Sequence, residues 1–160
     1  MQQIISIHSF RGGTGKSNIV ANLAALLAAE GKRVGVIDTD IQSPGIHALF
    51  GLDENTVNYA LNDYLWGKCD IGQAAHDVTP QGETAMAVNI FLIPSSLQSG
   101  EISRVLREGY AVSRLNDGYH ELMANLSLDI LLIDTHPGLN EETLLSIVIS
   151  DILVVIHCDL

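Results

Sequence analysis

Five short runs of apolar residues, most of them β-branched, divide the chain, and none of them alternates with polar residues. Continuous apolar runs of this length are typical of strands buried on both faces, as in a parallel sheet covered by helices. We therefore predict a mainly parallel sheet with strands at residues 4–7, 34–37, 90–93, 130–133 and 152–156.

The segments between these runs have helical character. Residues 17–30 place Val20 and Leu27 on one side, and Gly31 follows as a stop signal. Strands that alternate with helices indicate an α/β fold with right-handed crossovers. Further helices are predicted at residues 44–50, 56–66, 100–126 with a break at Gly109, and 141–150, whereas residues 67–88 fit a small hairpin or an irregular loop.

Composition supports one folded domain. Of the 160 residues, 47% are hydrophobic and 17% are charged, which excludes a disordered chain. Eight basic and 19 acidic residues give a net charge of −11, which argues against a whole surface that binds DNA or an anionic membrane. Arg104, Arg107 and Arg114 have roughly helical spacing, so a local basic stripe that contacts DNA phosphates is one interpretation. The alternative is a solvated helix face.

No targeting segment or membrane-spanning run is apparent, and we expect a soluble, cytoplasmic protein. The N-terminus lacks a basic start followed by a long apolar stretch, and Asp151 interrupts the most apolar region of the chain. Cys69 and Cys158 form no CxxC pair. We expect free thiols in a reducing compartment rather than a disulfide scaffold or a zinc module.

The strongest motif is SFRGGTGKS at residues 9–17, between a predicted strand and a predicted helix. Its glycines let backbone N–H groups turn inward around phosphate oxygens, and the helix N-terminus adds partial positive charge. Lys16 supplies a full charge, and the Ser17 hydroxyl is placed to bind Mg²⁺. The usual loop has glycine where Phe10 stands, so this is a deviant form. A dinucleotide-binding loop fails because it needs glycine or alanine at Asn18.

Carboxylates follow two of the predicted strands. Asp38 and Asp40 come after the second strand, where one can hold Mg²⁺ or its waters and the other can orient an attacking water; a helix-capping pair is the alternative. Asp134 ends the fourth strand in the Walker B arrangement, which binds Mg²⁺ through water. Gly138 can bring its N–H close to a γ-phosphate. We expect His136, which lies between Asp134 and Gly138, to be a neutral structural side chain.

The motifs RGGTGKS (11–17), DTDIQSPG (38–45) and DTHPG (134–138) together resemble the MinD/ParA family of P-loop ATPases. The family patterns are K-G-G-x-G-K-[ST], D-x-D-x-Q-x-x-x and D-[TC]-x-[PA]-[GA]. The resemblance implies a three-layer P-loop NTPase-like domain over residues 1–160. Because family members are longer, we expect this domain to be incomplete at its C-terminal end.

The resemblance also implies a function. Members bind Mg-ATP (ATP with Mg²⁺), form a face-to-face homodimer with ATP, and hydrolyse it slowly until a partner protein activates them. They position a cargo such as a plasmid, a chromosome or the division machinery, and DNA or membrane contact is a further option. Two alternatives stay open: a regulatory module that binds nucleotide with little hydrolysis, and a metabolic ATPase of the same superfamily, such as an amidoligase or a metallochaperone.

Site residues follow from positions in these motifs. Asp40 matches the residue needed for water attack, and the metal set is Ser17, Asp38 and Asp134. Arg11 stands where the family has the lysine that reaches the partner's ATP, and its guanidinium is suited to the role of an arginine finger. The catalytic set is therefore Asp40, Lys16 and Arg11, and the nucleotide-binding set is Arg11, Gly12, Gly13, Thr14, Gly15, Lys16, Ser17, Asn18 and Gly138.

Overall fold

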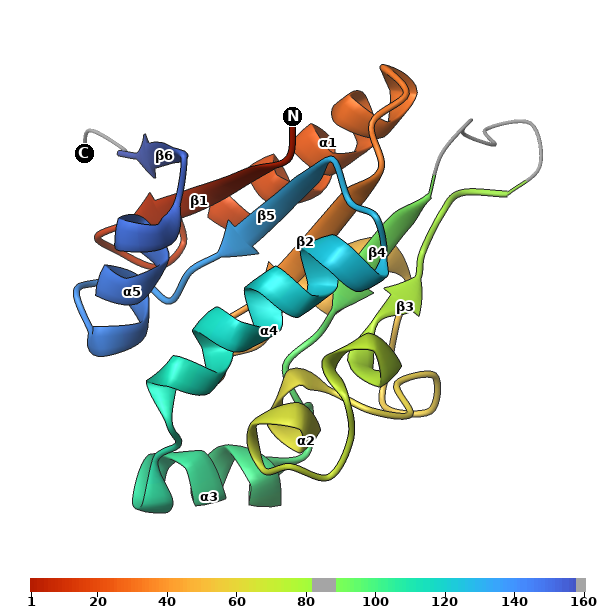
Figure 1. Cartoon of the computed structure of the whole chain (residues 1–160). Coiled ribbons are helices and arrows are strands. Elements are labelled where there is room, and N and C mark those ends of the chain that lie inside the picture. Colours follow the sequence, from red (N-terminus) through yellow and green to blue (C-terminus); the bar gives the residue numbers. More distant parts are fainter. Residues whose placement is uncertain (82–88, 158–160) are drawn as a thin grey trace.

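A six-stranded sheet forms the centre of the computed structural model, which describes residues 1–81 and 89–157 (Figure 1). The strand order is β3-β4-β2-β5-β1-β6. All neighbouring strands are parallel except β3, which runs antiparallel to β4. The five predicted strands are confirmed: β1 (Gln3–Ser9), β2 (Val34–Asp38), β4 (Ile90–Ile93), β5 (Ile130–Asp134) and β6 (Ile152–Ile156), with β3 (His76–Asp77) added at one edge.

Helices cover both faces of the sheet and complete the predicted three-layer α/β fold (Figure 1). One face carries α1 (Lys16–Ala29) and the 3₁₀ helix η1 (Ile46–Phe50). The opposite face carries the remaining helices: α2 (Leu61–Leu65), the 3₁₀ helix η2 (Ile71–Ala74), α3 (Ser99–Glu108), α4 (Val112–Asn125) and α5 (Glu141–Ile149).

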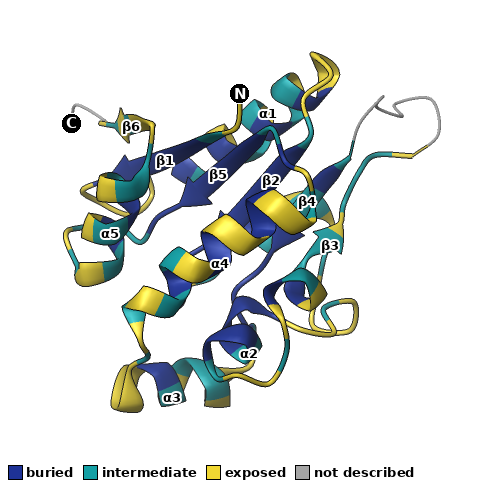
Figure 2. Ribbon diagram, in the orientation of Figure 1, coloured by how far each residue is buried: buried dark blue, intermediate teal, exposed yellow. Residues whose placement is uncertain are grey.

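Successive strand residues serve the two faces in turn, which explains why the runs are continuously apolar. In β2, Val34 and Val36 belong to the α1 side of the core, whereas Ile37 belongs to the α4 side. Figure 2 shows the resulting band of buried residues along the central strands. Gly35 permits close packing in this band, since a Cβ there would lie 2.5 Å from a methyl group of Leu128.

Two helix predictions needed adjustment, and the predicted break in a third helix is confirmed. The helix predicted at 56–66 is only α2, because the Asp53 side chain accepts hydrogen bonds from the N–H groups of Asn55 and Thr56 and holds a turn there. Residues 44–50 form the 3₁₀ helix η1 rather than an α-helix. The segment 100–126 is broken at Gly109, as predicted, into α3 and α4.

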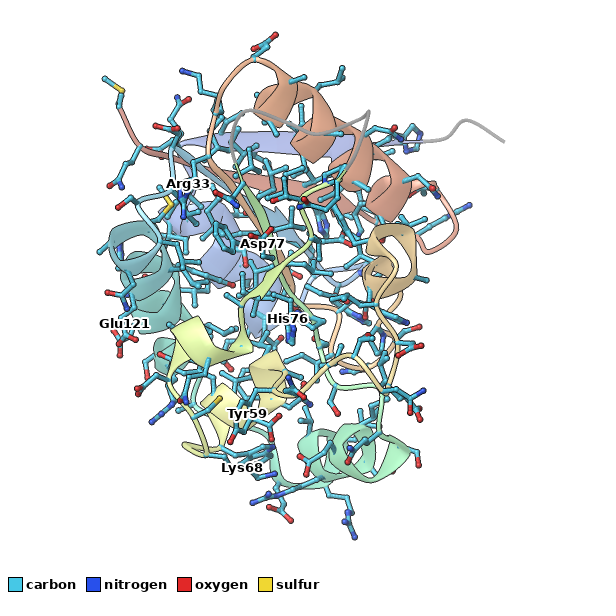
Figure 3. The ribbon with its side chains drawn as sticks, turned by 90° about the vertical axis from the view of Figure 1, so that its right-hand side faces the viewer. Arg33, Tyr59, Lys68, His76, Asp77 and Glu121 are labelled. Carbon is cyan, nitrogen blue, oxygen red and sulfur yellow. The ribbon has the colours of Figure 1, made fainter. Side chains whose placement is uncertain are left out.

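The two edges of the sheet differ from the sequence-based expectation. β6 is an outer strand of the described sheet, and Ile152, Leu153 and Val155 are 41–47% exposed, whereas the continuous apolar run predicted burial on both faces. At the other edge, seen face-on in Figure 3, β3 occupies part of the segment left open as a hairpin or loop. There the His76 ring bonds the Tyr59 carbonyl at 2.8 Å. Residues 82–88 of that segment, and Cys158, lie outside the described residues.

Within residues 1–81 and 89–157, no helix combines the length and apolar character needed to cross a bilayer.

Candidate functional site

A cavity of about 340 Å³ lies at the carboxyl ends of β1, β2 and β5. This is the edge at which parallel α/β sheets bind ligands. All eight predicted residues of the loop, from Arg11 to Asn18, line the cavity together with Asp40. Ser9, Ser43, His136 and Pro137 complete the lining. The structure therefore brings all three sequence motifs to one cavity: the first lines it in full, and the second and third contribute two residues each.

The loop between β1 and α1 has the backbone shape that its glycines predict. Gly13 and Gly15 have φ angles of 74° and 79°, in the left-handed region that suits glycine. Gly15 is the N-cap of α1, and no side chain caps that helix. The N–H groups of the first turn therefore point towards the loop, with the positive end of the helix dipole behind them. This arrangement suits an anion.

Two side chains of the loop converge on the carboxylate that ends β5. Lys16 is 6% exposed and forms an ion pair through Nζ with Oδ1 of Asp134, which is itself 1% exposed. The Ser17 hydroxyl donates to Oδ2 of Asp134 at 2.7 Å. One buried carboxylate therefore holds the predicted phosphate-binding lysine and the predicted metal ligand side by side.

Asp38 is the most deeply buried of the other carboxylates. Its Oδ1 accepts the backbone N–H of Asp40 at 2.9 Å, whereas Oδ2 has no hydrogen-bond partner among the described residues. Burial, followed by the nearby charge of Asp134, raises the pKa of Asp38 well above its usual value. A buried carboxylate oxygen without a donor fits a site for a hydrated cation, because carboxylate and hydroxyl oxygens are the ligands that Mg²⁺ prefers.

Asp40 has a partner that sequence reasoning missed. The His136 ring nitrogen Nδ1 lies 2.6 Å from Oδ1 of Asp40, and both residues line the cavity. The family pattern leaves position 136 open, so the motif gave no signal for this contact. The expectation of a purely structural ring applies better to His8, whose Nδ1 bonds the Thr135 hydroxyl at 2.9 Å. Burial and then Lys16 lower the pKa of His8, which favours its neutral form.

The backbone N–H of Gly138 is held by a hydrogen bond within the protein. The φ of Gly138 is 87°, and its N–H donates to the Ser9 carbonyl at 3.1 Å. A contact with a γ-phosphate, as predicted from the motif, requires this hydrogen bond to break. The segment that follows β5 is therefore tied to the end of β1.

Two of the three arginines considered for a basic stripe stack on aromatic rings. Arg104 lies in α3, where its guanidinium stacks 3.9 Å from the Trp66 ring centroid and pairs with Glu108. Arg114 lies in α4 and stacks over Tyr64 instead. The break at Gly109 places Arg114 on a different helix from Arg104 and Arg107, so the three do not lie along one continuous helix as the stripe required. Arg11, in contrast, is exposed at the cavity.

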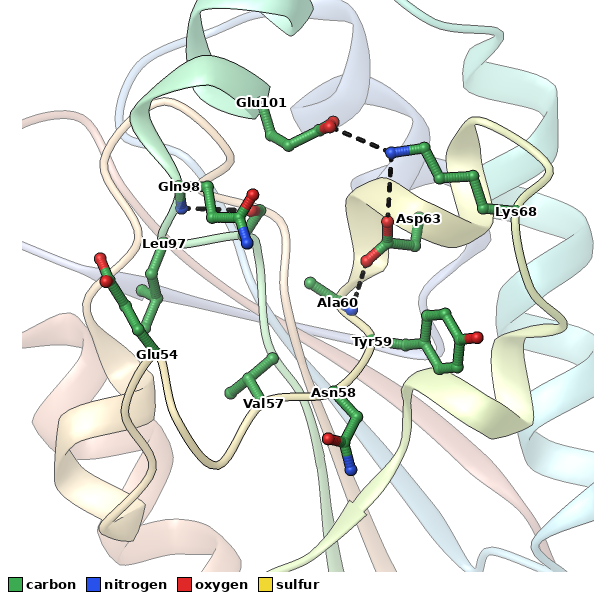
Figure 4. A pocket seen from close by; sticks show the side chains of 11 residues that line it. Glu54, Val57, Asn58, Tyr59, Ala60, Asp63, Lys68, Leu97, Gln98 and Glu101 are labelled. Atoms are coloured by element: carbon green, nitrogen blue, oxygen red, sulfur yellow. Dashed lines mark hydrogen bonds and ion pairs between the residues drawn. The ribbon is translucent and has the colours of Figure 1, made fainter.

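A second cavity, of about 140 Å³, lies between the segment at 54–68 and the start of α3 (Figure 4). None of the predicted site residues lines it. Lys68 bridges Asp63 and Glu101 there, with N–O distances of 3.4 and 3.0 Å. Because Lys68 and these two carboxylates pair with one another, they offer less charge to a ligand. The first cavity therefore remains the candidate functional site.

Comparison with known proteins agrees with this geometry. A family model described as "AAA domain" (AAA_31) matches residues 2–160. The chain is 36% identical to an uncharacterised ATP-binding protein of Methanocaldococcus jannaschii, over 95% of this chain and 51% of that protein. It is also 36% identical to an iron–sulfur cluster carrier protein of the same organism, over 88% of this chain and 43% of that protein. The chain therefore spans about half the length of the curated relatives it matches.

Among solved structures, the septum site-determining protein MinD from Pyrococcus horikoshii, complexed with Mg-ADP, superposes with a TM-score of 0.78. The two are 25% identical, and the match covers 98% of this chain and 58% of that one. Together with the family model and the three motifs at one sheet edge, this likeness shows that the chain belongs to the MinD/ParA family of P-loop ATPases, within the AAA-domain family AAA_31.

Proposed function

We propose that this protein binds Mg-ATP in the first cavity and hydrolyses it as a molecular switch. The observation that carries the proposal is the convergence of Lys16 and Ser17 on Asp134 at a glycine-rich helix N-terminus. A buried lysine, a hydroxyl and a carboxylate at that place suit terminal phosphates and their cation. The MinD structure that resembles this chain was solved with Mg-ADP.

In this proposal the phosphates lie against the backbone N–H groups between Gly12 and Ser17. Lys16 turns from Asp134 towards the β- and γ-phosphates, because a phosphate offers it an equivalent negative partner. Ser17, Asp38 and Asp134 would hold Mg²⁺ directly or through water. When bound, the cation neutralises charge on the phosphate oxygens.

Asp40 is the proposed catalytic carboxylate. It orients a water so that the water oxygen bonds the γ-phosphorus while the bond from that phosphorus to the β,γ-bridging oxygen breaks. ADP and phosphate are the products, and Asp40 accepts a water proton before releasing it to solvent. Its place in the lining of the same cavity as the loop supports this role.

The switch would act through dimerisation with ATP and control by a partner protein. Arg11 is exposed at the cavity, and exposed apolar side chains lie next in sequence to the site: Phe10 is 58% and Leu139 64% exposed. These features support a second copy that covers the cavity and receives Arg11. We propose the positioning of a cellular cargo as the biological role, in the cytoplasm, whose reducing conditions suit the free thiol of Cys69.

The experiment is phosphate release by the full-length protein with ATP and Mg²⁺. Asp40→Ala should retain ATP but lose hydrolysis by roughly 10²-fold or more, because general base assistance of this kind contributes that much. Hydrolysis by this variant at the wild-type single-turnover rate would remove Asp40 from the catalytic role. ATP binding without measurable hydrolysis by the wild-type protein would favour a regulatory nucleotide-binding module.

A further inference from the structure

We propose that His136 is a positioning residue that holds the Asp40 carboxylate in the orientation needed to direct the attacking water. The inference rests on the proposed function and adds a residue to which the family pattern assigns no role. It is motivated by the 2.6 Å contact between Nδ1 of His136 and Oδ1 of Asp40 within the cavity lining.

The direction of this hydrogen bond follows from the chemistry of the two groups. An ionised carboxylate only accepts, so the Nδ1–H of His136 is the donor. The side chains of Asp40 and His136 are 16% and 27% exposed, so water has restricted access to the pair. A short hydrogen bond with a charged acceptor is stronger than one between neutral groups.

Strand register brings the two residues together. Asp38 is directly opposite Asp134 in the parallel pairing of β2 with β5. Asp40 and His136 each lie two residues further along their chains, so they leave the sheet side by side. The contact therefore spans two motifs that are 96 positions apart in sequence.

The His136 backbone is held on both sides. Before it, the Thr135 hydroxyl donates to the Ile7 carbonyl at 3.0 Å. After it, Pro137 restricts the backbone of His136, and the N–H of Gly138 bonds the Ser9 carbonyl at 3.1 Å. Hydrogen bonds thus hold the segment that carries the imidazole against β1, so the ring has a fixed position from which to donate to Asp40.

The Asp40 backbone is held as well, but its carboxylate needs a further contact. The N–H of Asp40 donates to Asp38 at 2.9 Å, and its carbonyl accepts the N–H of Ser43 at 3.1 Å. These bonds fix the main chain and leave the two side-chain torsions free to rotate. The hydrogen bond from His136 selects one orientation, and small misplacements of a reacting group carry large rate penalties.

The test uses steady-state ATP hydrolysis by the full-length protein and three variants. His136→Ala should lower kcat about tenfold to hundredfold, while KM for ATP changes less than about threefold because Asp40 is not part of the phosphate cradle. His136→Asn should restore most of kcat, since its amide can donate from nearly the same place as Nδ1. His120→Ala, on the exposed side of α4, is the matched control and should behave as wild type.

A second measurement examines the contact without catalysis. Denaturant unfolding of Asp40→Ala, His136→Ala and the double variant should give non-additive destabilisation, because the two side chains share one interaction. Additive effects would overturn the contact. A wild-type kcat in His136→Ala, or failure of His136→Asn to restore kcat, would overturn the positioning role.

Failure of the proposal is distinguishable from failure of the proposed function. If wild-type protein hydrolyses ATP and His136→Ala hydrolyses it equally well, only the role of His136 falls. If wild-type protein neither binds nor hydrolyses ATP, the proposed function and the role of His136 fall together.

Discussion

Asp38 illustrates at the scale of one residue how a site for a cation conflicts with stability. Its carboxylate is buried beside Asp134, and one of its oxygens lacks a donor among the described residues. The folded-state pKa is raised, so the folded protein binds more protons than the unfolded chain at intermediate pH. Stability should therefore fall as the pH rises from about 4, the ordinary Asp pKa, through the raised folded value.

Asp38→Asn should remove this pH dependence. We expect the ligand-free variant to gain about 1 kcal/mol in unfolding free energy at pH 8, because a buried charge is removed while the acceptor for the Asp40 N–H is kept. The gain should vanish near pH 4, and Mg²⁺-dependent ATP binding should weaken. Denaturant unfolding at pH 4 and pH 8 checks this, and a variant less stable than wild type at pH 8 would contradict it.

Some site residues could be predicted from the sequence because their roles depend on local structure, whereas others depend on contacts between distant strands. Lys16 and Ser17 could be predicted because their roles depend only on a local junction between a strand and a helix. The contact between His136 and Asp40 depends on the register of β2 against β5. Sequence periodicity predicts that both strands exist but carries no information on that register, so this contact required the structure.

At the scale of elements, the turn from β1 to α1 places two glycines, Gly13 and Gly15, in the left-handed region. Gly15 has a φ of 79°, and a Cβ there would meet no atom within 4 Å. Gly15→Ala should therefore cost about 1–2 kcal/mol in unfolding free energy from backbone strain alone.

Gly12 provides the matched control for that substitution. A Cβ at Gly12 would likewise meet no atom within 4 Å, but the φ of this residue lies outside the left-handed region. Gly12→Ala should leave the unfolding free energy unchanged or raise it by up to about 1 kcal/mol. Denaturant unfolding without nucleotide measures both variants, and equal effects on stability would refute the strain argument.

The same local logic explains which elements could be predicted. The strands follow from continuous apolar runs, and the break at Gly109 follows from a residue that ends helices. The start of α2 was missed because it depends on side-chain bonds: the Asp53 carboxylate holds the preceding turn, and Asp63 accepts the Ala60 N–H at 3.0 Å. Hydrophobic periodicity does not report such bonds.

At the scale of the whole molecule, the exposure of Arg11 at the cavity leads to a prediction about association. If Arg11 meets the nucleotide of a second copy, Arg11→Ala should spare nucleotide binding by the monomer and weaken dimerisation with ATP. Arg11→Lys should retain dimerisation, because it keeps the charge and restores the family residue. Light scattering of the full-length protein with ATP, with ADP and without nucleotide measures this.

Dimerisation of Arg11→Ala with ATP as readily as wild type would rule out a role in the partner's site. Arg11 would then act only within its own loop, and the balance would shift towards a nucleotide-binding module with little hydrolysis.

The most direct test of the account is calorimetric titration of the full-length protein with ATP and Mg²⁺. Wild-type protein and Lys32→Ala, an exposed lysine beyond the far end of α1, should bind ATP equally. Lys16→Ala should lose measurable binding while keeping its circular dichroism spectrum, because the phosphates lose their buried cation. Absence of binding by wild-type protein, or equal affinity in a folded Lys16→Ala variant, would contradict the account.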